Sequence, residues 1–167
     1  MSHDYWATFV ELVRTPFQQV ELVWGIVPLY FSWLANELTS SKASFRTAVQ
    51  TGFGFLWGGA HWTWQYLQQR PSAPAPAHLH SIPAVNLIVT ALVLVLGALA
   101  LVSGLRRRYP RGLAFLGHTR FSAYFMIAIF PIQSDVLPWT WDRLLAIAIF
   151  AVPIWVLLHF GLMPLRR

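Results

Sequence analysis

Three long stretches without a charged residue constrain this chain more than any other feature. They run from Thr47 to Gln69, from Ser81 to Leu105 and from Leu144 to Leu165. Each reaches the roughly 20 residues that a helix needs to cross a hydrocarbon core about 30 Å thick. The composition agrees, because 56% of the residues are hydrophobic and only 11% are charged, less than half the usual share of a soluble domain. The sequence therefore predicts an all-α integral membrane protein.

Two weaker segments raise the predicted number of membrane spans to about five. Segment 22–36 is apolar but has a glutamate at each end, and segment 121–134 is long enough only if its helix begins near residue 112. We therefore expect a single membrane domain over residues 1–167. It would contain an interfacial helix at 1–16 and spans at about 18–37, 46–68, 82–105, 112–133 and 143–164.

The positions of the basic residues support this topology and give it a direction. With five spans, one side of the membrane receives Lys42, Arg46, Arg106, Arg107, Arg108, Arg111, Arg120, Arg166 and Arg167. The other side receives only Arg14, Arg70 and Arg143. Such a bias predicts an outer N-terminus and a cytoplasmic C-terminus, and the compact loops fit a prokaryotic inner membrane. We interpret the cluster at Arg106, Arg107, Arg108, Arg111 and Arg120 as contacts with lipid headgroups that fix orientation.

Small and polar residues gather on one face of each of the first two spans. Helical spacing aligns Gly25, Pro28, Ser32 and Asn36 on the first span, and Gln50, Gly54, Gly58 and Gln65 on the second. Because small residues let helix backbones approach closely, these two stripes are predicted to pack together. Glu21 and His61 lie on the same faces at a similar depth and form a candidate intramembrane polar pair. A hydrated, interfacial Glu21 and a purely structural hydrogen bond are the competing interpretations.

Cofactor binding is not expected, although two histidines suggest one possibility. His118 and His159 fall at a similar depth near the predicted cytoplasmic face, where neutral imidazoles would suit axial ligation of a haem or a chlorin. No second histidine pair repeats this arrangement at the outer level, and a hydrogen-bonded histidine explains the sequence equally well. The chain has no cysteine, and His78 and His80 alone are too few ligands to predict a metal site.

Two further expectations concern the later spans. Segment 82–105 is almost uniformly Leu, Val and Ala, so we expect it to face lipid or another apolar helix. Asp135 and Asp142 precede or begin the last span, where carboxylates suit the positive end of a helix and are expected to cap it.

The sequence contains no catalytic motif that we recognise: it has no glycine-rich phosphate loop and no HExxH segment. We therefore do not expect an enzyme. The leading hypothesis is a non-catalytic integral membrane subunit, or an assembly or scaffold component, of a larger membrane complex. Its partners would be the lipid bilayer and other membrane subunits, not nucleic acid.

One alternative is a small transporter or channel component using Glu21 and His61. Another is a haem- or chlorin-binding accessory subunit of an electron-transfer or photosynthetic complex, using His118 and His159.

Overall fold

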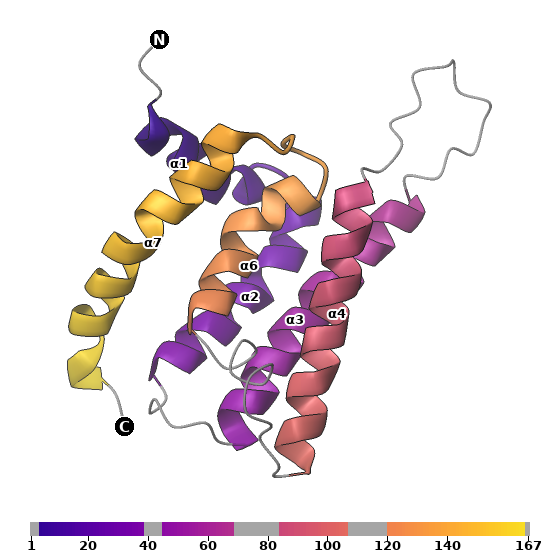
Figure 1. The fold of residues 1–167 in the computed structure, drawn as a ribbon, viewed down its shortest axis with the longest axis vertical. Helices are drawn as coiled ribbons and strands as arrows, with labels where there is room; N and C mark the ends of the chain where they lie inside the picture. The colour runs from indigo at the N-terminus through magenta and orange to yellow at the C-terminus, as the bar shows by residue number, and fades with distance from the viewer. Residues whose placement is uncertain (1–3, 39–44, 69–83, 107–119, 166–167) are drawn as a thin grey trace.

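The computed structural model describes residues 4–38, 45–68, 84–106 and 120–165, and this part of the chain is helical, without strands. Its elements are α1 (Tyr5–Arg14), η1 (Thr15–Phe17), α2 (Val20–Leu38), α3 (Phe45–Gln68), α4 (Ala84–Leu105), α6 (Arg120–Gln133), α7 (Trp141–Gly161) and η2 (Met163–Leu165). In Figure 1, α2 and α6 lie in the middle and α3 and α4 form an antiparallel pair on one flank. On the other flank, α7 stands away from the centre, with α1 beside its first turns.

Two helices of the described chain are long and apolar enough to cross a membrane, judged by length and composition. They are Ala84–Leu105 and the segment Trp141–Leu158 of α7. The apolar segment Ser122–Gln133 is shorter, α2 includes two glutamates, and α3 includes glutamine, threonine, histidine and many glycines. These polar residues lower the hydropathy of α2 and α3. Length and composition therefore do not support the five expected spans. The described part of the chain is all-helical and has two candidate spans.

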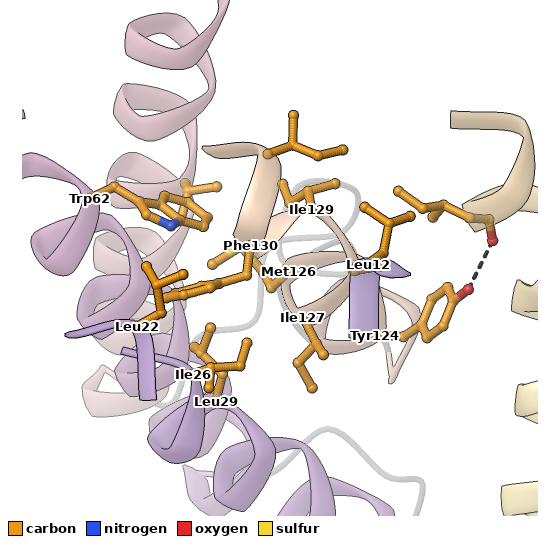
Figure 2. Close-up of a cluster of buried hydrophobic side chains, with 14 of the residues drawn as sticks. Leu12, Leu22, Ile26, Leu29, Trp62, Tyr124, Met126, Ile127, Ile129 and Phe130 are labelled. Atoms are coloured by element: carbon orange, nitrogen blue, oxygen red, sulfur yellow. Dashed lines mark hydrogen bonds between the residues drawn. The ribbon is translucent and has the colours of Figure 1, made fainter. Parts of the chain in front are cut away.

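The hydrophobic core surrounds α6. Every residue from Met126 to Ser134 is buried, which means that neighbouring helices cover this part of α6 on all sides. Figure 2 shows its side chains meeting residues from α1, α2 and α3, among them Leu12, Leu22, Ile26, Leu29 and Trp62. The Tyr124 hydroxyl donates a hydrogen bond of 2.8 Å to the carbonyl oxygen of Ile147 and so joins α6 to α7.

Glycines allow α3 and α4 to approach closely. A Cβ added at Gly52 would lie 2.6 Å from Leu101 Cγ, and one at Gly97 would lie 2.9 Å from Phe55 Cβ. Only a hydrogen atom fits at either position, so the two backbones pack with almost no side chain between them. One face of α4 is thus buried against α3, and its opposite face, which carries Leu92 among other apolar residues, is exposed.

The predicted N-terminal helix is present as α1, and its contacts are mainly with α7. The Asp4 side chain caps α1 by accepting a hydrogen bond from the first turn. The rings of Phe9 and Phe150 pack with centroids 4.8 Å apart. At the same end, Arg143 Nη2 lies 3.2 Å from Glu11 Oε2 in an ion pair. These contacts hold the beginning of α7 against α1.

The N-cap of α7 differs from the expectation. Thr140, not either aspartate, occupies this position, and its hydroxyl oxygen accepts a hydrogen bond of 3.3 Å from the Arg143 N–H. Asp142 lies within the first turn, where its charge suits the helix dipole, and Asp135 has a φ of 57° in the preceding loop. The prediction that the carboxylates cap α7 is wrong because the cap is the residue directly before the helix, in extended backbone.

Candidate functional site

The small and polar stripes of α2 and α3 lie against each other in the structure. The Ser32 hydroxyl donates a hydrogen bond of 2.6 Å to the Gln50 carbonyl oxygen. One turn further along, Asn36 Nδ2 donates to Thr51 Oγ1 at 3.1 Å. A Cβ at Gly54 would lie only 2.8 Å from Ser32 Oγ. Close backbones and hydrogen bonds across the interface therefore hold these helices together.

At the other end of this interface, the His61 ring lies over Gly25. A Cβ at Gly25 would lie 2.5 Å from His61 Nε2 and 2.5 Å from Phe130 Cζ. The His61 and Phe130 rings stack with centroids 5.5 Å apart. His61 Nε2 is buried, and no described residue hydrogen-bonds to it. Next to the contact between His61, Gly25 and Phe130, Gly58 faces Met126. Pro28, on the same face of α2, is half-buried.

No ion pair joins Glu21 to His61 among the described residues, and His61 Nε2 has no hydrogen-bond partner there. The Glu21 side chain is exposed and borders an open pocket of about 210 Å³ between the start of α2 and the end of α3. Trp64, Gln65 and Gln68 form the rest of the lining. Gln65 Oε1 is buried and unpaired among the described residues. The structure thus brings Glu21 to a polar pocket one helical turn from His61.

A buried amide cluster near the same end of the bundle was missed by the sequence analysis. Gln133 Nε2 donates to the Asn86 carbonyl oxygen at 3.1 Å and to Thr90 Oγ1 at 3.3 Å. The Tyr66 hydroxyl donates to the Gln133 carbonyl oxygen, and Trp139 Nε1 donates to Asn86 Oδ1. Together these bonds connect α3, α4, α6 and the loop before α7. A sequence signal existed, because Asn86 and Gln133 are lone amides near the predicted outer ends of apolar segments.

Several polar atoms around this cluster have no hydrogen-bond partner within the described ranges. They are Trp62 Nε1, Asn86 Nδ2, Gln133 Oε1 and Ser134 Oγ, and all four residues are buried. Buried polar atoms are usually satisfied by protein or by ordered water. This end of the bundle therefore has more buried donors and acceptors than the described residues pair with one another.

A second pocket lies where α7 stands away from α2 and α6. It has a volume of about 150 Å³ and is lined by Trp33, Glu37, Tyr124, Ala151, Val152, Trp155 and Leu158. We call it the α7 groove. Glu37 is only 2% exposed. From the sequence alone, this residue is interpreted only as the end of a predicted span. Apart from Glu37, the groove is largely apolar and aromatic, which suits a hydrophobic side chain or chain segment.

Most of the remaining predicted site residues, or their side chains, lie outside what the structure describes. His118, Arg107, Arg108 and Arg111 lie outside the described residues, as do the side chains of His159 in α7 and Arg120 at the start of α6. Arg106 is exposed at the end of α4. In the four described ranges, no group of three or more His, Cys, Asp or Glu residues is arranged to hold a metal ion.

Comparison with known proteins adds no assignment: no protein-family model, curated protein or solved structure matches this chain.

Proposed function

We propose that this chain is a non-catalytic membrane subunit that receives a transmembrane helix of a partner protein in the α7 groove. The observation that carries the proposal is the position of α7. This helix has the length and composition of a membrane span, yet only 11% of its most apolar window is buried. Its first turns are held by α1, whereas its second half stands away from α2 and α6 (Figure 1).

The groove beside α7 has the size of a side-chain anchor site. Its volume of about 150 Å³ resembles that of apolar protein cavities that hold one aromatic ring. Helices in a membrane associate through such packing, because lipid and apolar side chains are equally hydrophobic. A partner helix would insert one large apolar side chain between Trp33 and Trp155 and would cover the exposed face of α7. Buried anchors of this kind dominate the affinity of protein interfaces.

The proposal includes the five-span topology, with an outer N-terminus, a cytoplasmic C-terminus and α1 on the outer surface. In support, α2, α3, α4, α6 and α7 alternate in direction (Figure 1). The glutamates of α2 lie near its two ends, and the exposed Glu21 is placed to reach the outer interface. A prokaryotic inner membrane remains the expected location.

Photo-crosslinking in native membranes tests the proposed partner. A benzophenone amino acid at Val152, which lines the groove, should give a protein adduct, whereas the same group at Ile149, which is exposed outside it, should label mainly lipid. The adduct should disappear when Ala151→Phe fills the groove and should persist in the matched variant Ala148→Phe, because Ala148 does not line it. A lipid adduct alone at Val152, or a protein adduct unaffected by Ala151→Phe, would overturn the proposal.

The transporter alternative has less geometric support. Directly beside the Glu21 pocket, the His61 ring, Gly25 and Phe130 are in close contact and fill the bundle. The alternative predicts that Glu21→Gln abolishes flux in proteoliposomes. The haem or chlorin alternative depends on His118 and His159 and stays a prediction, which a visible absorption spectrum of the purified protein tests directly.

A further inference from the structure

The pocket beside Glu21 combines three features that recognise an organic cation. The Glu21 carboxylate supplies a negative charge and has no ion-pair partner in the described chain. Trp64 supplies an indole, the aromatic group that attracts ammonium ions most strongly. Gln65 and Gln68 supply amide oxygens that accept hydrogen bonds.

One residue of the pocket lining, Gln65, carries an acceptor without a partner. Gln65 lines the pocket, and its Oε1 is buried and has no hydrogen-bond partner among the described residues. A buried acceptor without a partner is costly unless water or a ligand donates to it. A primary ammonium group has three N–H donors and would satisfy Glu21 and Gln65 together. A single carboxylate with two amides is a poor set of ligands for a metal ion, since divalent ions need more oxygen ligands.

An exposed aromatic surface leads from the pocket along α2 and α3. Trp24, one turn after Glu21, is exposed, and its carbonyl oxygen accepts a hydrogen bond of 3.3 Å from Trp57 Nε1. The Trp57 ring stacks on Phe53, with centroids 6.0 Å apart, and both side chains are exposed. A polar pocket at the end of two helices and an apolar aromatic surface below it match the two parts of a lipid molecule.

We propose that the pocket of Glu21, Trp64, Gln65 and Gln68 binds the ammonium headgroup of a membrane phospholipid, whose acyl chain lies along Trp24, Trp57 and Phe53. The carboxylate and indole hold the cation, and the amide oxygens accept its N–H groups. The phosphate faces the aqueous side of the interface. This inference depends on the proposed membrane position of α2 and α3, but not on a partner in the α7 groove. That groove includes the opposite end of α2, so either proposal can fail alone.

Native mass spectrometry of the full chain tests this assignment. The protein is first exchanged into detergent with phosphatidylglycerol and then titrated with phosphatidylethanolamine of the same acyl chains. We expect one ethanolamine lipid to bind about tenfold more tightly than phosphatidylglycerol, and Glu21→Gln to remove this preference. Glu11→Gln, which removes the same charge outside the pocket, should keep it. Equal binding of the two lipids, or a preference that survives Glu21→Gln, would overturn the proposal.

Two further arms identify the source of the ammonium group. Soluble phosphoethanolamine should compete at least about tenfold more weakly than the lipid, because it has no acyl chain to bury. Equal competition would overturn the lipid assignment in favour of a soluble amine. Trp57→Ala should weaken the lipid and leave the soluble headgroup unaffected. Circular dichroism and thermal melting of each variant show whether it is folded, and a folded Trp57→Ala protein with unchanged lipid binding would contradict the proposed acyl-chain path.

Discussion

The helices α6 and α7 are neighbours in sequence, yet their environments are opposite. The last eight positions of α6, from Met126 to Gln133, are all buried, and α6 packs against four other helices, whereas most side chains along α7 are exposed. Hydrogen bonds and glycine contacts tie α6 and α2 to α3, while α7 is held through α1, Arg143 and the Tyr124 hydroxyl. The difference separates a central helix that the rest of the described chain covers from a peripheral helix that keeps most of its side chains exposed.

The largest expected difference between these regions comes from a matched pair of isoleucines. Ile129 in α6 is fully buried, and Ile149 in α7 is 48% exposed. Ile129→Ala should lower the free energy of unfolding by about 3 kcal/mol, because it leaves a cavity in the core. Ile149→Ala should cost less than about 1 kcal/mol, because little packing is lost. Unfolding in detergent measures both values, and similar losses would show that α7 is packed as firmly as α6.

Glycine substitutions give the next largest contrast. Gly25→Ala should destabilise the protein by about 2 kcal/mol, since the new methyl group meets the His61 and Phe130 rings at 2.5 Å. Gly161→Ala in α7 is the matched control, because no atom lies within 4 Å of its added Cβ. Thermal melting of the two variants compares them. If Gly25→Ala melts like the unmodified protein, then the α2–α3 contact is looser than the structure shows.

The amide cluster is expected to contribute a smaller amount. Gln133→Leu removes two hydrogen bonds from Gln133 Nε2, to Asn86 and Thr90, and should cost about 1 kcal/mol, the usual net contribution of intramolecular hydrogen bonds. Gln68→Leu is the control, because Gln68 is exposed at the end of α3. Amide hydrogen exchange in α4 should also increase in Gln133→Leu. An unchanged stability and exchange pattern would mean that water replaces the lost side chain.

The smallest effect should come from the ion pair that anchors α7. A double-mutant cycle of Arg143→Gln and Glu11→Gln should give a coupling energy of about 0.5 kcal/mol, because Glu11 is 46% exposed. The coupling should decrease as salt increases. If it instead exceeds the cost of Gln133→Leu, then α7 is attached to α1 more strongly than α6 is to α4.

The sequence predicts which residues share a helix face better than it predicts the number of membrane spans. The stripe of Ser32 and Gly54 follows from helical period alone, and these residues do lie in contact. The expected number of five spans is not supported, because the polar groups that α2 and α3 place in their shared interface lower the hydropathy of both helices.

The amide cluster and the α7 groove could not be predicted, for a different physical reason. Asn86 and Gln133 are distant in sequence, and only the antiparallel order of the helices brings them together. Glu37 has the sequence context of a boundary residue, and its burial depends on how α7 departs from the bundle. Periodicity reports the face that a residue occupies but not which helix covers that face.

The burial of α6 also has a consequence for how the protein is made. On the proposed membrane topology, a helix that carries Arg120 at its start and Gln133 at its end enters lipid only at a cost, because charged and amide side chains partition poorly into hydrocarbon. The residues that accept hydrogen bonds from Gln133 Nε2, namely Asn86 and Thr90, belong to α4, which precedes α6 in the chain. On that topology, α6 would insert only after α4 is in place to pair with Gln133, and α7, which follows α6 in the chain, would join the bundle after it.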